Sequence, residues 1–302
     1  MKIVYSDRYD LNLGDHVFPS VKYKLTRDKL LADGIAWPED FVEPEPASDD
    51  DVALVHHPDY IHRLKTGKLS FAEILRLEIP YSPALIRAVW LSAGGSILAG
   101  RLAREDGVTA SLGGGFHHAC ADHGEGFCVI HDVAIAIRRL QKDGAIRSAM
   151  TVDCDVHQGN GTAEIFAGDP NVFTFSIHQE HNYPHPKPPS SLDINLEDGT
   201  GDDEYLAALE QGLEQSFSAL KPDLMFYLAG ADPYHEDQLG GLKLSLHALE
   251  MRDRMVLEKA RAGNVPVAVT LAGGYARHVA DTVRIHCNTV RVVKEFASGN
   301  QY

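Results

Sequence analysis

The sequence is short of cysteine and of basic residues, and each shortage argues against a class of protein. Four of the 302 residues are cysteines (Cys120, Cys128, Cys154 and Cys287), and none forms a Cys-x-x-Cys pair. Neither a zinc ribbon nor a thioredoxin-like redox motif is therefore indicated. Lysine and arginine number 28 against 43 aspartates and glutamates, which gives a formal net charge of −15. Such a chain repels phosphate backbones, which argues against nucleic acid as a partner and favours cationic substrates.

A signal peptide and a long apolar run are also missing. The start, MKIVYSDRYD, has no basic stretch followed by an apolar one. No apolar stretch is expected to cross a bilayer. Cys154 lies in an apolar strand pattern, where a disulfide is awkward, so the cysteines indicate a reducing compartment. We expect a cytoplasmic protein that does not contact membranes.

Short β-branched runs alternate with longer amphipathic stretches along the chain. This alternation predicts a mainly parallel sheet covered by helices on both faces, in one three-layer α/β/α domain of residues 1–302. The expected strands are Ile3–Tyr5, Val52–Val55, Val108–Ser111, Ala149–Asp153, Val172–Ile177, Leu224–Leu228 and Val265–Leu271. The expected helices include Pro83–Arg104, Val133–Lys142, Asp203–Ala219 and Ala248–Ala262. Two proline-rich polar segments, Glu43–Asp51 and His181–Ser191, are expected to be loops.

The strongest chemical pattern, DCDVHQGNG, follows the expected strand that ends at Asp153. If the chain stays extended, Asp153, Asp155 and His157 point to the same side. Two carboxylates and an imidazole on one side of a strand end are suitable ligands for a divalent cation. A polar turn would explain the same residues, but Asp153 lies in the apolar part, where an unpaired carboxylate is costly. We therefore favour a metal site.

Glycines and two adjacent histidines follow another expected strand. Gly113-Gly-Gly-Phe lead into His117 and His118. Glycines let the backbone approach a ligand closely or take positive φ. A chance pair is the alternative because the chain has 16 histidines, but the strand-end position favours function. In the GEGFC segment that follows, Cys128 has no flanking base, so we interpret it as a packed cysteine.

Two further strand ends carry an aspartate and a tyrosine. Asp232 ends the segment LAGAD, where an aspartate is common in turns. We nevertheless favour Asp232 as a metal ligand, because the metal site needs a third ligand from a different strand. Tyr275 ends LAGGY, which could also be a tight turn with a packed aromatic ring. Four strand ends thus supply Asp, His and Tyr side chains to the edge where open parallel sheets bind ligands.

Taken together, these motifs resemble the histone deacetylase family of the arginase–deacetylase superfamily. The matches are GGGFHHA, GFC, DCDVHQGNG, GAD followed by QLGGLKLS, and AGGY; they keep the family's order over roughly residues 5 to 280. The Asn in HQGNG and the early HVFPSVKY segment are more similar to class IV and bacterial members than to class I. The resemblance implies the arginase–deacetylase fold and a zinc-dependent deacetylase or deacylase. Its substrate would be an acylated lysine of a peptide or protein, or a small acylated amine.

The resemblance also implies individual roles. The residues that match the family's zinc ligands are Asp155, His157 and Asp232. His117 and His118 match its histidine pair, with His118 as the expected general base, and Tyr275 matches the tyrosine that polarises the acyl carbonyl. Asp153 matches a carboxylate that orients His117 and touches a structural potassium site. Asn160 falls where class I enzymes carry Asp behind the second histidine, and a neutral partner would lower the pKa of His118.

Substrate-binding residues follow from the same resemblance. The expected walls of a narrow acyl-lysine tunnel are Gly126, Phe127 and Tyr183, with the Gly126 carbonyl accepting the substrate amide hydrogen. Some polyamine-selective members carry a glutamate at the place that aligns with Leu239. An apolar side chain cannot pair with a secondary ammonium, so acyl-lysine is favoured over acetylpolyamine. Glu236 and Asp237 weaken this preference if the loop shifts, and an apolar tunnel would also accommodate longer acyl chains.

Two other functions fit parts of the pattern. A binuclear manganese ureohydrolase needs extra bridging carboxylates. Such enzymes carry a second Asp two residues after the position of Asp232, where this chain has Tyr234. A catalytically inactive binding module is disfavoured because both histidines and Tyr275 are retained. His131, where many members have Asn, is given no role, and the oligomeric state is left open.

Overall fold

One parallel sheet forms the centre of the fold. Its eight strands lie in the order β2-β1-β3-β8-β7-β4-β5-β6, and every neighbouring pair is parallel. The structure is a computed structural model that describes residues 1–299. The strands are β1 (Ile3–Val4), β2 (Phe41–Val42), β3 (Val108–Ser111), β4 (Ala149–Asp153), β5 (Val172–Gln179), β6 (Leu192–Leu196), β7 (Leu224–Leu228) and β8 (Val267–Thr270).

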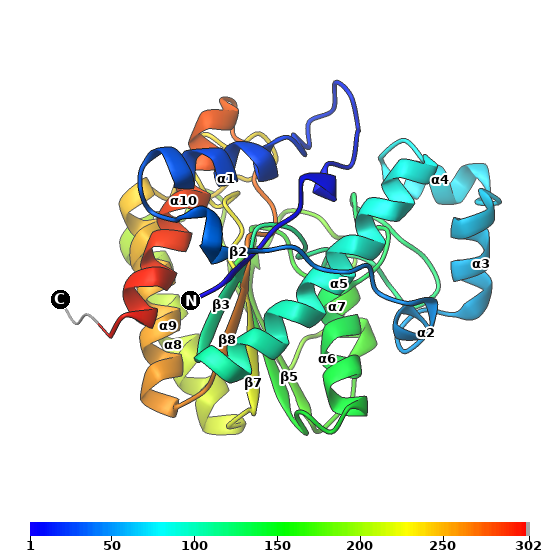
Figure 1. The fold of residues 1–302 in the computed structure, drawn as a ribbon. Coiled ribbons are helices and arrows are strands. Elements are labelled where there is room, and N and C mark those ends of the chain that lie inside the picture. Colours follow the sequence, from blue (N-terminus) through cyan, green and yellow to red (C-terminus); the bar gives the residue numbers. More distant parts are fainter. Residues whose placement is uncertain (300–302) are drawn as a thin grey trace.

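Helices cover both faces of this sheet (Figure 1). The α-helices of the described residues are α1 (Lys22–Ala32), α2 (Asp49–Val52), α3 (Pro58–Thr66), α4 (Phe71–Leu77), α5 (Pro83–Asp106), α6 (Asp132–Lys142), α7 (Asn160–Ile165), α8 (Asp202–Ala219), α9 (Leu246–Gly263) and α10 (Val279–Ala297). Helices α8, α9 and α10 pack on one face, and α5 and α6 pack on the other. The predicted three-layer α/β/α architecture is therefore confirmed.

Most of the expected strands are present, and one is wrong. Strands β4 and β7 are buried along their whole length, as their apolar sequences predict for a sheet covered on both faces. Val52–Val55 is not a strand, because Val52 ends helix α2 and a turn follows. A capping box explains the difference. The Ser48 hydroxyl accepts the Asp51 amide at 3.1 Å, and the Asp51 carboxylate accepts the Ser48 amide at 2.9 Å.

The two strands that the sequence patterns missed lie at the edges of the sheet. Strand β2 has only two residues, too few for any periodicity. Strand β6 is mostly half-buried and follows the proline-rich loop His181–Ser191, which is irregular as expected. The expected loop Glu43–Asp51 is irregular only up to Ser48, where α2 begins. The four expected helices correspond to α5, α6, α8 and α9.

Helix α5 is long and apolar enough to cross a membrane by length and composition, contrary to the expectation that no stretch is. However, 72% of its apolar window is buried, and the helix contacts β3, β8 and α6. Glycines permit this close packing. A Cβ atom at Gly94 would lie 1.9 Å from the Glu45 carbonyl oxygen, and one at Gly95 would lie 2.1 Å from the Tyr9 hydroxyl. The apolar length of α5 therefore serves the core of the fold.

The strand order determines which loops lie next to one another at the edge of the sheet. Strands β3, β8, β7 and β4 are consecutive neighbours in the sheet, although they are far apart in sequence. Because all are parallel, their carboxyl ends meet at one edge. The loops after these four strands carry the histidine pair, the AGGY turn, Asp232 and the DCDVHQGNG segment.

Candidate active site

The segment after β4 brings three polar side chains into the interior. Asp153, Asp155 and His157 are 2%, 1% and 8% exposed. Asp155 Oδ1 lies 3.1 Å from His157 Nδ1. Asp153 instead turns to the histidine pair, with Oδ2 2.7 Å from His117 Nδ1. The alternating pattern thus brings all three residues together in the interior. Asp155 and His157 contact each other, whereas Asp153 contacts His117.

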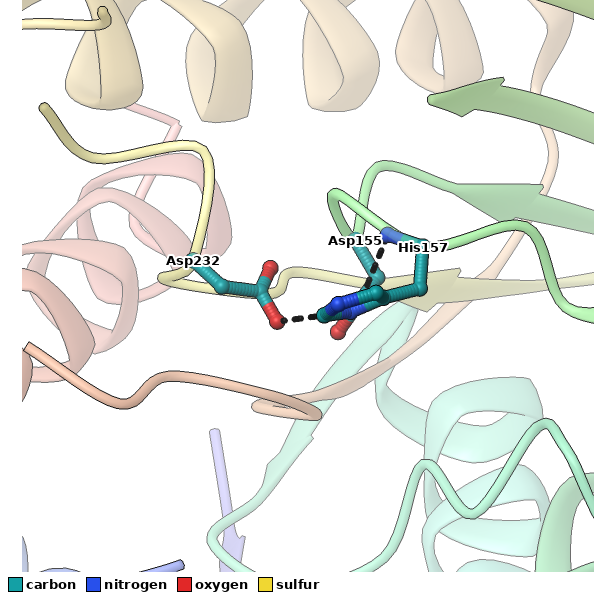
Figure 2. Close-up of side chains that lie close together, drawn as sticks. All are labelled: Asp155, His157 and Asp232. Atoms are coloured by element: carbon teal, nitrogen blue, oxygen red, sulfur yellow. Dashed lines mark hydrogen bonds and ion pairs between the residues drawn. The ribbon is translucent and has the colours of Figure 1, made fainter. Parts of the chain in front are cut away.

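Asp232, from the loop after β7, completes a cluster with Asp155 and His157. Figure 2 shows the three side chains converging from two loops. Their nitrogen and oxygen atoms that could bind a metal lie within 4.8 Å of one another. Asp232 Oδ1 accepts the Val156 amide at 2.9 Å, but Asp232 Oδ2 is buried without a hydrogen-bond partner, 3.6 Å from His157 Nδ1. A buried carboxylate oxygen without a donor points to a cation as its partner.

The charges of this cluster also fit a bound cation. Burial and the nearby Asp155 carboxylate raise the pKa of Asp232 to about 7. Burial would raise the pKa of Asp155 as well, but His117 and His157 hold it well below its usual range. Two carboxylate oxygens and one imidazole nitrogen are ligands that zinc accepts, and three protein ligands leave the open position typical of catalytic zinc sites. The residues therefore fit zinc.

The AGGY turn after β8 lies directly against this cluster. The Gly273 amide donates to Asp155 Oδ2 at 2.9 Å. A Cβ atom at Gly273 would lie 2.1 Å from Asp232 Oδ2 and 2.4 Å from Asp155 Oδ2. Only glycine can occupy this position without displacing both carboxylates.

The glycine run after β3 is held in place by a buried carboxylate. Gly114 and Gly115 have φ values of +94° and +84°, the left-handed region that favours glycine. Asp132, at the start of α6, accepts the amides of Gly115 at 3.0 Å and Phe116 at 2.8 Å. These bonds fix the loop that delivers the two histidines to the site.

His117 and His118 have different partners and opposite electrostatic environments. Burial alone would lower the pKa of His117, but Asp153 and Asp155 raise it to about 9. His118 Nδ1 lies 2.7 Å from Asn160 Oδ1, a neutral partner. Burial and the two neighbouring histidines, His117 and His157, lower the pKa of His118 well below its usual range. His118 is therefore the neutral member of the pair.

Tyr275 reaches the same site from the AGGY turn. Its ring is 6.5 Å from the ring of His157 and 5.8 Å from that of Phe127, measured between centroids. Its backbone amide donates to Asp237 Oδ2 at 2.7 Å. Burial and the carboxylates of the cluster raise the pKa of the phenol well above its usual value. The hydroxyl is therefore protonated and able to donate.

A small cavity of about 20 Å³ lies beside these groups. It is lined by Phe18, Tyr23, Gly114, Gly115, Phe116, His117, His118, Gly126, Phe127, Cys128, Asp155, Ala272, Gly273 and Tyr275. Gly126 lies between His118 and Tyr183, because an added Cβ would come within 2.9 Å of both rings. The rings of Tyr183 and His118 are 4.9 Å apart. Of the expected wall residues, Gly126 and Tyr183 thus lie against His118, and Phe127 lines the cavity.

Leu239 does not line this cavity. Its side chain is half-buried and packs against the core, and its carbonyl oxygen accepts Asn182 Nδ2 at 2.8 Å. Asp237, one of the two acids that weaken the argument from Leu239 if the loop shifts, is already buried without such a shift. It accepts the amides of Leu239, Gly240 and Tyr275.

Several residues that shape the site were missed by the sequence patterns. Asp132 and Asp237 hold the histidine and tyrosine loops through backbone bonds. Glu125 contacts Asn160 and Tyr183. His131, which was given no role, is buried and caps α6, where its Nδ1 accepts the Ala134 amide at 3.1 Å. Two local signals were available: an acid at a helix start for Asp132, and a capping position for His131.

An open parallel sheet with a buried Asp–His–Asp cluster and a histidine pair at its carboxyl edge defines the site of a hydrolytic enzyme with a candidate metal centre. Residues 16–290 match the histone deacetylase domain. An uncharacterised protein of Picosynechococcus is 41% identical over 281 residues, which span 93% of this chain and 94% of that protein. Histone deacetylase 2 of Arabidopsis thaliana is 33% identical over 301 residues, which span 94% of this chain and 78% of that protein.

A solved structure points to the same fold. The crystal structure of a histone deacetylase homologue from Aquifex aeolicus matches with a TM-score of 0.83 at 24% identity, covering 99% of this chain and 84% of that one. The chain belongs to the histone deacetylase family, and it is a hydrolase of the deacetylase type.

Proposed function

We propose that this protein is a zinc-dependent deacetylase that hydrolyses the amide of an acylated amine, with acyl-lysine as the favoured substrate class. The observation that carries the proposal is the buried cluster of Asp155, His157 and Asp232, in which Asp232 Oδ2 has no hydrogen-bond partner among residues 1–299. These three residues would hold the zinc ion. When bound, zinc acts as a Lewis acid on the acyl carbonyl and on water.

The chain's own residues supply the proton transfers. His118, neutral and bonded through Nδ1 to Asn160, takes the proton of the attacking water as general base. The same proton is then available for the leaving amine. His117 stays positively charged beside Asp153 and stabilises negative charge that develops nearby. Tyr275 donates a hydrogen bond to the developing oxyanion of the acyl group.

A short acyl group suits the site best. The cavity beside the histidines and Tyr275 has a volume of about 20 Å³, roughly the space that one water molecule needs. A methyl group fits the same scale, whereas a long acyl chain would require the surrounding side chains to move. This supports acetyl over longer chains. Gly126, Phe127 and Tyr183 would line the path of the lysine side chain.

The polyamine alternative gains no support from the loop around Leu239. Asp237 is buried and already accepts three backbone amides, so its carboxylate is not presented to a substrate ammonium. Leu239 itself offers no charge. Acetylpolyamine and other small amides therefore stay second candidates, and Glu236 is the carboxylate on this loop that could still serve them.

Two rival functions on the same fold are disfavoured. A binuclear ureohydrolase would need a further carboxylate near Asp232, but Asp155, His157 and Asp232 are the only such cluster within residues 1–299. An inactive binding module would not need a neutral histidine and a protonated tyrosine at one cavity.

We also propose a structural potassium ion near Asp153 and a cytoplasmic location. Both Asp153 oxygens already have partners, the Asp155 amide at 3.1 Å and His117, so backbone carbonyls would have to supply most potassium ligands.

The four cysteines are free and buried, in keeping with the proposed reducing, cytoplasmic compartment. We propose a single domain spanning residues 1–302.

The test compares kcat/KM for an acetyl-lysine peptide, a myristoyl-lysine peptide and acetylspermidine under one set of conditions, together with metal analysis. We expect one zinc per chain and the highest value for the acetyl-lysine peptide. A clear preference for acetylspermidine would overturn the argument from Leu239 and Asp237. Loss of all three activities in zinc-loaded protein would overturn the deacetylase proposal itself.

A further inference from the structure

Behind the histidine pair, the Asn160 amide lies between His118 and a carboxylate with no assigned role. Asn160 Oδ1 is 2.7 Å from His118 Nδ1, and Asn160 Nδ2 donates to Glu125 Oε1 at 2.5 Å. The same Glu125 oxygen accepts the Tyr183 hydroxyl at 2.8 Å, while Oε2 lies 3.4 Å from His123 Nε2. We propose that Glu125 is a positioning residue that sets the tautomer of His118 through the side-chain amide of Asn160.

The first step is the orientation of the amide. Burial would raise the pKa of Glu125, but its bonds to His123, Tyr183 and Asn160 hold it below its usual value. Glu125 is therefore ionised, and an ionised carboxylate can only accept hydrogen bonds. The amide atom that faces Glu125 must then be the Asn160 NH2 group. This forces the Asn160 oxygen to face His118.

The second step passes from the amide to the imidazole. The Asn160 oxygen can only accept, so Nδ1 of His118 must carry the hydrogen that joins them. In a neutral imidazole the other nitrogen, Nε2, then holds a free lone pair. Within residues 1–299, Nε2 of His118 has no hydrogen-bond partner, and the ring lines the small cavity beside Tyr275. Nε2 is thus free to accept a proton there.

Asn160 alone could not impose this state. An amide can rotate to exchange its oxygen and nitrogen, and the rotated form would present NH2 to His118 Nδ1. Nδ1 would then have to accept, Nε2 would carry the hydrogen, and the histidine could not take a proton at the cavity. The Glu125 carboxylate behind the amide removes this alternative, because in the rotated form the Asn160 oxygen would face the carboxylate and both groups can only accept. Glu125 thereby secures an arrangement that the neutral asparagine leaves ambiguous.

The inference rests on the proposed role of His118 as general base, so the experiment reads the tautomer separately from activity. Glu125→Leu removes the acceptor at similar size. Asn160→Asp replaces the amide by a group that can only accept, so the Nδ1–H tautomer no longer depends on Glu125. Both single variants and the double variant would be made in the full-length, zinc-loaded protein. Glu105→Leu, an exposed glutamate near the end of α5, is the matched control.

Two measurements follow on each variant: kcat and KM for an acetyl-lysine peptide, and the ¹⁵N chemical shifts of the imidazole nitrogens. The His118 signals are identified by their loss in His118→Ala. In the wild type and in Glu105→Leu we expect a protonated Nδ1 and an unprotonated Nε2. In Glu125→Leu we expect a mixture of tautomers and a fall in kcat of about 10–100-fold, the range typical of outer hydrogen-bond partners in active sites.

The double variant separates positioning from simple structural support. Asn160→Asp alone places two carboxylates face to face, whereas adding Glu125→Leu removes that repulsion. We therefore expect Glu125→Leu to lower kcat in the wild-type background and to raise it in the Asn160→Asp background, a non-additive result. An equal loss in both backgrounds would overturn the proposal, as would an unchanged Nδ1–H tautomer in Glu125→Leu. If the wild type hydrolysed no acetyl-lysine, the proposed function would fail while the chemical shifts still decided this inference.

Discussion

Replacing Gly273 by alanine should expel the metal while leaving the fold intact. The added Cβ would lie 2.1 Å from Asp232 Oδ2 and 2.4 Å from Asp155 Oδ2, closer than real Cβ atoms approach any heavy atom. Both carboxylates must therefore move by a large fraction of an ångström, whereas metal–ligand distances tolerate deviations of about 0.2 Å. The φ of Gly273 is not in the left-handed region, so alanine can adopt the same backbone conformation.

The magnitude follows from the number of ligands affected. Losing a single hydrogen-bond partner behind a metal ligand typically costs about 10–100-fold in metal affinity. Gly273→Ala displaces two of the three proposed ligands themselves, so zinc affinity should fall by at least about 100-fold, or about 2.8 kcal/mol. Deacetylase activity should fall in parallel at limiting zinc and recover in part at high zinc.

The assay is a competition titration of zinc against a chelator, with circular dichroism to check the fold. Gly201→Ala is the matched control, because Gly201 precedes α8 and a Cβ atom there would meet nothing within 4 Å. We expect wild-type zinc affinity in this control. A folded Gly273→Ala protein that binds zinc as tightly as wild type would refute the assignment of Asp155 and Asp232 as ligands.

Three further predictions concern the same cluster. Tyr275→Phe should keep zinc and fold but lower kcat by about 10²–10³, the usual cost of one oxyanion donor; near wild-type turnover on an unactivated amide would rule out this role. Dialysis against a chelator should abolish activity and lower Tm together, because Asp155 and Asp232 lose their counterion and a ligand that binds only the folded state stabilises it. Zinc should restore both, and two metals per chain with activity on guanidino substrates would contradict a mononuclear deacetylase. Zinc affinity should rise as pH increases from about 6 to 8, because protons compete with zinc for the ligands. The pKa values of Asp232 and His157 are raised to about 7 and about 10, so both side chains bind protons in this range. An affinity that is flat or falls with pH would argue against both residues as ligands.

The interior of the sheet could be predicted from sequence because its strands are apolar on both faces. Ala149–Asp153 and Leu224–Leu228 match β4 and β7 residue for residue. Prediction failed where tertiary contacts or local capping decide the structure. Val52–Val55 is β-branched at both ends, yet the Ser48–Asp51 capping box starts helix α2, which ends at Val52. The short strand β2 exists through its parallel pairing with β1, which no local pattern encodes.

The convergence of the proposed metal ligands and the histidine pair could be predicted because their motifs follow strand ends, and parallel neighbours bring those ends together. Residue spacing alone could not tell that Asp153 faces His117 while Asp155 faces His157, since both aspartates lie on the same side of an extended chain. The family resemblance had implied these partners. The chain turns after β4, and that turn separates their roles. Leu239 was placed by alignment alone, and it lies outside the cavity beside the metal cluster.

The residues that sequence patterns missed share one physical cause. Loops at a strand edge have backbone N–H groups that no helix or sheet satisfies, and a buried N–H needs an acceptor. Here carboxylates supply it: Asp132 for the histidine loop and Asp237 for the tyrosine loop, each through more than one amide. Asp155 and Asp232 also accept backbone amides, Asp155 through both oxygens and Asp232 through Oδ1 alone. In sequence these aspartates look alike, because only the fold decides which carboxylates converge with His157 and which only hold a loop in place.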